Sequence, residues 1–280
     1  MSATELTTTP GAEPQLQATT EAHAGPAISL AAESIGSIGG FPITNSLLTA
    51  WLVAALLVAL GLVIRSRVQL IPRGLQNAAE AILEFLLKLA DQVTGDRRQS
   101  EQFFPLVATI FIFIVTANWF GLLPFVGPVG VHTVHEGQSV VVPLLRSANA
   151  DLNMTLALAI IAVVSLQVFG IATIGFARYA GKFFNFKNPI FFAVGLLELV
   201  GEVAKVISFS FRLFGNIFAG EVLLIVIGSL VAYVAPLPFY GLELFVGFIQ
   251  ALVFSTLTLV FLKMAVTDHA EHDHAAAGAQ

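Results

Sequence analysis

The chain has 280 residues, of which 56% are hydrophobic and only 11% are charged, and its mean hydropathy is +0.86. This composition lies far outside the range of soluble globular proteins and is typical of proteins that cross a membrane several times. The net charge of -5 is spread over both tails and several loops, so it gives no indication of nucleic-acid binding. Because cysteine is absent, disulfides, thiolate metal sites and a cysteine nucleophile are excluded.

The first third of the chain contains one predicted span and one predicted surface helix. Residues 1–34 are expected to form a disordered tail outside the membrane, because most of this stretch is rich in Thr, Ala, Glu and Pro. The stretch 46–64 contains no charged residue and approaches the ~20 residues that cross a bilayer. Residues 74–89 place apolar side chains at helical spacing opposite Glu80, Glu84 and Lys88, which predicts an amphipathic helix in the membrane interface.

Four further apolar segments follow, at 103–126, 152–177, 189–234 and 239–265, and the last precedes a tail over 267–280. As a single helix, the segment 189–234 would measure about 65 Å, twice a hydrocarbon core of ~30 Å, so it must tilt steeply or break. Pro236 and Pro238 mark the turn into the final helix. The sequence therefore predicts an all-α integral membrane protein of about five to six helices. They would form one membrane domain over 35–266, with a long tilted two-helix hairpin at its C-terminal end.

The distribution of basic residues predicts the orientation of these segments. The loops after the first and third spans hold nine Lys and Arg residues, whereas the opposite side holds Arg146 alone. By the positive-inside rule, those two loops and the C-terminal tail are cytoplasmic and the N-terminal tail is outside.

The segment 189–234 carries five charged residues, namely Glu198, Glu202, Lys205, Arg212 and Glu221. An arginine keeps its proton and costs roughly 2.5 to 3.5 kcal/mol at the bilayer centre, so it usually faces protein or a water-filled path. On an ideal helix the other charges fall within about 80° of Arg212, except Glu221, which falls about 180° away. The helix is therefore expected to present a fixed cation on one face and an isolated carboxylate on the other.

The final helix carries a second polar stripe, formed by Glu243 and Gln250, which lie within about 20° of each other. Glu221 lies thirteen residues before Val234, where the turn begins, and Glu243 lies five after Pro238, so both belong to the outer half of the membrane. They are expected to line a path that reaches in from outside and stops short of Arg212. Glu198 belongs nearer the cytoplasmic side.

The run Phe211-Arg-Leu-Phe-Gly-Asn-Ile-Phe-Ala-Gly-Glu221 resembles the signature of subunit a of F-type ATP synthases of the bacterial type. Members of this family are stator subunits that carry ions past the rotating ring of c subunits. Other matching segments are Gly40 to Ser46, Asn118 to Pro124, Ala150 to Thr155, and Gln250 in the final helix. The resemblance covers nearly all of residues 35–266.

The resemblance implies roles for individual residues. Arg212 matches the essential arginine that separates two proton half-channels beside the c-ring, and Gln250 matches its neighbour. Glu221 and Glu243 match the two positions that line the outer half-channel. The other implied proton-path positions are Asn216, Ser208, Glu198, Asn118, Asp151 and Asn153. Gly121 stands where some relatives carry an acid, so that group is missing here.

The resemblance also implies the partners and the location. They are the c-ring, the b subunits of the peripheral stalk and membrane lipid, in a bacterial plasma (inner) membrane; a nucleic-acid partner is not expected. The chain contains no phosphate-binding glycine loop, so nucleotide chemistry belongs to partner subunits. We expect a non-catalytic membrane subunit with no cofactor and no metal.

Two other functions remain open from the sequence. A secondary ion transporter would favour interrupted helices or repeated halves, and neither is evident. A membrane scaffold would not explain an arginine opposite carboxylates at two depths. At the residue level, Arg212 could pair with Glu198 or Glu202 or reach the membrane surface, and Glu221 and Glu243 could be interface carboxylates.

Overall fold

The computed structural model describes residues 32–38, 41–124, 126, 130–135, 138–176, 179, 181, 189–231 and 234–267. Six α-helices dominate these residues, and five of them are long and apolar enough to cross a membrane. The chain is therefore an all-α integral membrane protein with several spans, as predicted. The predicted tail residues 1–31 and 268–280 lie outside the described residues.

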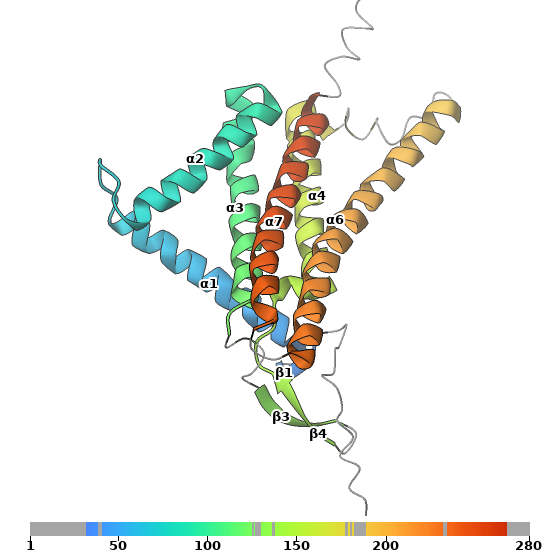
Figure 1. The fold of residues 1–280 in the computed structure, drawn as a ribbon. Coiled ribbons are helices and arrows are strands. Elements are labelled where there is room, and N and C mark those ends of the chain that lie inside the picture. Colours follow the sequence, from blue (N-terminus) through green and yellow to red (C-terminus); the bar gives the residue numbers. More distant parts are fainter. Residues whose placement is uncertain are drawn as a thin grey trace, which may run out of the picture.

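Helices α1 (Asn45–Ser66) and α2 (Leu75–Thr94) form a V beside the other helices (Figure 1). The hydroxyl of Thr44 caps α1 by accepting a hydrogen bond from the backbone N–H of Leu47 at 3.3 Å. Most apolar side chains of α1 are exposed, as expected for a helix that faces lipid. The predicted interfacial helix over 74–89 corresponds to α2, which continues to Thr94 because Leu86 and Ala90 are buried against the bundle.

Helices α3 (Arg97–Gly121), α4 (Leu152–Ile174) and α7 (Pro236–Thr267) lie side by side, and α6 (Pro189–Leu230) meets them at the end of the bundle near the strands and leans away from them toward its other end (Figure 1). The sequence left open whether the segment 189–234 tilts or breaks. In the structure, α6 is one unbroken helix of 42 residues. Its oblique course accommodates a length of about 63 Å, well beyond the hydrocarbon thickness. Helices α6 and α7 form the long tilted hairpin that the sequence predicted.

The core of the bundle contains large apolar side chains from each of these four helices. Phe209 and Leu213 of α6 pack with Phe254 of α7, Leu166 of α4 and Ile114 of α3, and all five are at most 2% exposed. The rings of Phe209 and Phe254 lie 4.9 Å apart. Because lipid is as apolar as these side chains, tight packing rather than exclusion of water holds the helices together.

Helix α3 begins six residues before the predicted span of 103–126 and ends five residues before its end. It begins early because the carboxylate of Asp96 accepts a hydrogen bond from the backbone N–H of Arg98 at 3.0 Å, which caps a polar first turn. It ends at Gly121 because Pro124 follows closely, and a proline cannot continue a helix.

Two antiparallel hairpins were not predicted. Strand β1 (Ser34–Ile38) pairs with β2 (Phe41–Thr44), and β3 (Gly130–His135) pairs with β4 (Gln138–Pro143). The second hairpin is rich in valine, which favours strands, and it lies at the end of the bundle where α3 stops (Figure 1). From this hairpin the chain runs through Arg146 and the short 3₁₀ helix η1 (Ala148–Ala150) into α4.

Candidate functional site

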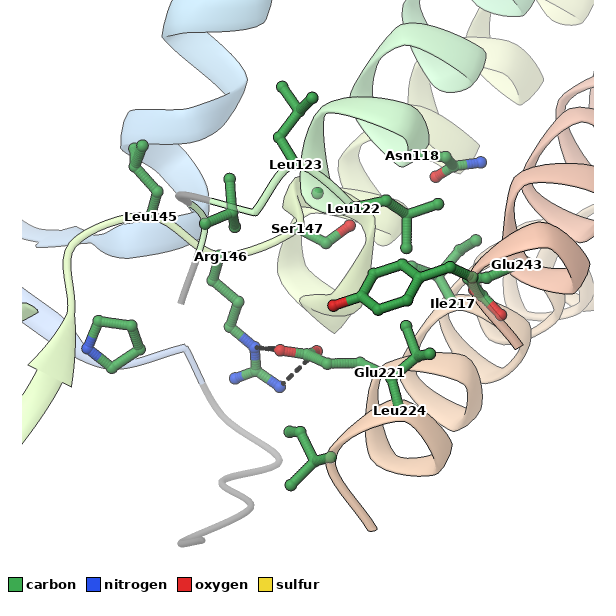
Figure 2. Close-up of a pocket in the computed structure, with 15 residues that line it drawn as sticks. Asn118, Leu122, Leu123, Leu145, Arg146, Ser147, Ile217, Glu221, Leu224 and Glu243 are labelled. Carbon is green, nitrogen blue, oxygen red and sulfur yellow. Dashed lines mark hydrogen bonds and ion pairs between the residues drawn. The ribbon is translucent and has the colours of Figure 1, made fainter. Parts of the chain in front are cut away.

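A cavity of 160 Å³ lies among α3, α6, α7 and the segment that follows β4 (Figure 2). Three of the residues that the sequence singled out line it, each from a different helix: Asn118, Glu221 and Glu243. Ser147 and Tyr240 also line this cavity, which we call the outer cavity. The structure therefore brings together the carboxylates of α6 and α7 and the amide of α3.

Glu221 forms an ion pair with Arg146 across the outer cavity (Figure 2). The Nε atom of Arg146 lies 3.2 Å from both carboxylate oxygens of Glu221, and its Nη2 atom lies 3.2 Å from Oε2. The side chain of Arg146 is only 8% exposed, and its guanidinium carbon lies 5.9 Å from the ring centre of Phe218. This partly buried ion pair joins the segment before η1 to the C-terminal quarter of α6.

Glu243 has different surroundings, although it lines the same cavity. It is 8% exposed, and its carboxylate forms no hydrogen bond or ion pair with any residue that the structure describes. The carboxylate lies directly against the backbone of Gly220, where a Cβ atom would overlap it. The absence of a side chain at Gly220 therefore allows α7 to place this carboxylate against α6.

Asn118 holds α3 against two other elements. Its Nδ2 atom donates to the backbone carbonyl of Gly247 on α7 at 2.9 Å, and its Oδ1 atom accepts from Nδ2 of Asn149 in η1 at 2.7 Å. Gly121, one turn further along α3, faces Ser147 so closely that a Cβ atom would lie 2.6 Å from the serine Cβ. Both residues fix the wall of the outer cavity.

Arg212 lies on an exposed face of α6. Its Nη2 atom donates to the hydroxyl of Ser208 at 3.4 Å. Both residues line a second hollow, of 260 Å³, which we call the inner hollow; Lys205, Leu257 and Phe261 also line it. Among the described residues no carboxylate lies within ion-pair distance of Arg212.

The alternative pairing of Arg212 with Glu202 therefore does not occur in this structure, because Glu202 pairs with Lys205 instead, at 2.7 Å. Glu198 lies fourteen residues before Arg212, about 21 Å along an ideal helix, which is too far for a direct contact.

Asn216 and Gln250 connect α6 to α7 between the two hollows. The Nδ2 atom of Asn216 donates to Oε1 of Gln250 at 2.6 Å. Gln250 is buried, and its Nε2 atom is without a hydrogen-bond partner among the described residues. The sequence predicted both as neighbours of Arg212. In the structure, Asn216 lies about one helical turn beyond Arg212 on the side of the outer cavity, and Gln250 is hydrogen-bonded to Asn216.

Asp151, Asn153 and Glu198 lie outside the two hollows. Asp151 caps α4 by accepting a hydrogen bond from the backbone N–H of Asn153 at 3.0 Å, and it accepts another from the hydroxyl of Ser46 at 2.6 Å. Asn153 itself is exposed in the first turn of α4. These contacts join α4 to the start of α1.

Arg146 is the charged residue of the outer cavity that the sequence reasoning did not single out as a site. A signal was present, because Arg146 is the one basic residue on the predicted outer side of the membrane. Its pairing with Glu221 depends on how the β3–β4 hairpin returns the chain, and local sequence patterns do not reveal that.

Comparison with known proteins identifies the family of this chain. The sequence profile of the family described as ATP synthase A chain matches residues 47–263. The chain belongs to the ATP synthase subunit a family. A similar relative is ATP synthase subunit a of Campylobacter jejuni subsp. jejuni serotype O:23/36 (strain 81-176), 38% identical over 224 residues, which are 79% of this chain and 89% of the relative.

Two further members come from other bacteria. ATP synthase subunit a of Gloeobacter violaceus is 38% identical over 228 residues, which cover 81% of this chain and 86% of the relative. That of Moorella thermoacetica is 30% identical over 234 residues, which cover 83% and 95%. The resemblance inferred from the residues around Arg212 is thereby confirmed at the level of the family.

Proposed function

We propose that this chain is the ion-translocating stator subunit of a rotary ATP synthase, with two proton half-channels separated by Arg212 beside the rotating c-ring. The observation that carries the proposal is the arrangement along α6. Its residue Glu221 lines the outer cavity, whereas Arg212 lines the inner hollow on a different face. Arg212 and Glu221 are nine positions apart, which corresponds to about 13.5 Å of helix, so the two hollows would open at different depths of the membrane.

The outer cavity would form the half-channel from the outside. Asn118, Glu221 and Glu243 supply polar groups within a span region that is otherwise apolar, as ion pathways in membranes require. Asp151 and Asn153 lie at the same end of the bundle, and their hydrogen bonds suit a role in holding α4 and α1 in position.

The inner hollow would form the half-channel to the cytoplasm. Ser208 and Arg212 lie on its wall, and Glu198 lies further along α6 toward the predicted cytoplasmic side. Asn216 and Gln250 lie between the hollows, where their hydrogen bond would hold α6 and α7 together beside the arginine.

Arg212 would act on a carboxylate of the c-ring. At a separation of about 4 Å and an effective dielectric constant near 20, the attraction is about 4 kcal/mol. This energy favours the ionised rotor carboxylate by about a thousandfold, so a proton that arrives with it is released. Because the ionised site cannot enter lipid and the protonated site can, release and reloading on opposite sides of Arg212 would couple proton flow to rotation. The guanidinium cannot itself carry protons, and its fixed charge opposes a direct leak.

The proposal includes the partners and the orientation. The c-ring would face the exposed side of α6 at Arg212, and the b subunits of the peripheral stalk and lipid would cover other faces. Nucleotide chemistry would occur in partner subunits, and this chain would not be catalytic. The distribution of Lys and Arg supports an N-terminus outside and a cytoplasmic C-terminus in a bacterial plasma membrane.

The test is Arg212→Lys in the whole ATP synthase, assayed in inverted membrane vesicles for proton-driven ATP synthesis. A lysine provides a compact ammonium that can lose its proton when desolvated, so we expect synthesis to be abolished with the complex assembled. Arg98→Lys is the matched control, because Arg98 is exposed at the start of α3, and it should leave synthesis unchanged. Normal coupled synthesis by Arg212→Lys would refute the role of Arg212. It would also reopen the scaffold and transporter functions.

A further inference from the structure

The loop that joins α1 to α2 carries large apolar side chains on its surface. Figure 1 shows it at the tip of the V that these two helices form, away from the bundle. Leu70 is fully exposed, Ile71 is 70% exposed and Val68 is 65% exposed. Contact of such a cluster with water is unfavourable, so we expect an apolar partner to cover the tip of this loop.

Three arginines flank these apolar residues: Arg65 in the last turn of α1, Arg67 directly after it, and Arg73 shortly before α2. Their side chains are exposed, and none forms a hydrogen bond or an ion pair with a residue that the structure describes. The sequence offers no carboxylate nearby, because no acidic residue occurs between Glu33 and Glu80. The loop therefore carries three positive charges that the described part of the chain does not compensate.

Gln76, in the first turn of α2, gives the loop a defined shape. Its Oε1 atom accepts a hydrogen bond from the backbone N–H of Gln69 at 3.0 Å. Its Nε2 atom donates to the carbonyl of Gln69 at 3.0 Å and to Oε1 of Glu80 at 2.8 Å. Gly74 permits the return into α2, because its φ of 59° is a conformation that residues with a side chain rarely adopt. These contacts hold the apolar tip between the flanking arginines.

A phospholipid with an anionic head group offers both kinds of contact that the loop requires. The guanidinium group of an arginine binds phosphate oxygens, and apolar side chains favour the acyl region below the head groups. Both are within reach, because α1 is long and apolar enough to cross the membrane and the loop follows its last turn. A free phosphate ion would leave the apolar tip uncovered. A stable protein interface buries about 800 Å² on each partner, which a loop of this size does not supply.

We propose that the loop between α1 and α2 is a binding site for anionic phospholipid. Arg65, Arg67 and Arg73 contact lipid phosphates, and Leu70 and Ile71 enter the acyl region. The bound lipid holds the tip of the V at the membrane surface. The proposal requires only that α1 crosses the membrane, so it is independent of the proposed proton path.

A photoreactive side chain at the tip of the loop identifies what covers it. The variant Leu70→p-benzoylphenylalanine is made in the whole ATP synthase and irradiated in vesicles of equal amounts of phosphatidylcholine and phosphatidylglycerol. Mass spectrometry of the loop peptide then identifies the adduct. We expect phospholipid adducts in which phosphatidylglycerol exceeds phosphatidylcholine several-fold. Equal adducts of the two lipids, no lipid adduct, or a cross-link to another subunit would each overturn the proposal, and the last would assign the surface to a protein partner.

Substitution of the arginines in the same vesicles tests their part in the site. Each basic residue near an anionic membrane surface contributes roughly fivefold in affinity, so three contribute about a hundredfold. Arg65→Gln/Arg67→Gln/Arg73→Gln, combined with the probe, should therefore lose the preference for phosphatidylglycerol. Arg65→Lys/Arg67→Lys/Arg73→Lys keeps the charges and should keep most of the preference. A triple glutamine variant that retains the full preference would contradict the proposal.

The matched control is Lys88→Gln/Arg97→Gln/Arg98→Gln, which removes the same number of positive charges from exposed positions on α2 and α3. It should leave the preference unchanged, and the ATPase activity bound to the membranes checks that every complex is assembled. If the control loses the preference as fully as the loop variant, general attraction between the protein and the membrane explains the result and the loop is not a site. Arg212→Lys should not alter the lipid adducts, so this proposal and the proposed function fail or succeed separately.

Discussion

Asp151 allows a test that separates a structural role from a role in the proton path. Its carboxylate is buried and accepts hydrogen bonds from the backbone of Asn153 and from the hydroxyl of Ser46. Loss of a helix cap costs about 1 kcal/mol. Loss of a hydrogen bond to a charged acceptor costs about 1.5 to 3 kcal/mol. Asp151→Ala should therefore destabilise the subunit by roughly 2.5 to 4 kcal/mol, which lowers its melting temperature by roughly 5 to 15 °C.

Asp151→Asn should differ sharply from Asp151→Ala. The amide oxygen can still cap α4 and the amide nitrogen can donate to Ser46, so most of the stability and nearly all proton pumping should remain. The assay combines thermal denaturation of the purified complex in detergent with pumping in inverted vesicles. The reasoning is refuted if Asp151→Asn assembles with normal thermal stability but no longer pumps, because the carboxylate would then carry protons.

Three further predictions concern the cavity wall, the contact between α6 and α7, and the surface. Gly121→Ala should slow proton pumping, because its Cβ would press on Ser147 next to Arg146, and adding Ser147→Gly should restore the rate. Asn216→Leu should lower the melting temperature of the complex by several degrees, because it leaves the buried amide of Gln250 without its observed partner; an unchanged melting temperature would contradict this. Arg97→Gln should change neither stability nor pumping measurably, since exposed ion pairs contribute little.

Features governed by local periodicity could be predicted from the sequence. The apolar length of each segment identified the spans, since a bilayer of fixed thickness requires a nearly fixed number of helical residues. The separation of Arg212 from Glu221 also followed from helix geometry, and the two residues line different hollows. The ends of α3 were harder to predict, because the N-cap at Asp96 and the nearby Pro124 determine where the helix begins and ends.

Contacts between distant segments could not be predicted in this way. Arg146 lies 75 residues before Glu221, and the two meet only because the β3–β4 hairpin returns the chain over the end of the bundle. The same holds for the bond from Asn118 to the carbonyl of Gly247, 129 residues away. By contrast, the N-cap formed by Asp151 is a local feature that can be predicted from the sequence, since an aspartate just before an apolar helical run is a typical N-cap.

The central claim is that two half-channels open on opposite sides of the membrane, and cysteine labelling tests it most directly. The chain contains no cysteine, so Leu224→Cys in the outer cavity and Ala204→Cys in the inner hollow each introduce a single reactive thiol. We predict that a membrane-impermeant maleimide labels Leu224→Cys only in right-side-out vesicles and Ala204→Cys only in inverted vesicles. Labelling of both variants from the same side, or of either one from both sides, would contradict the account.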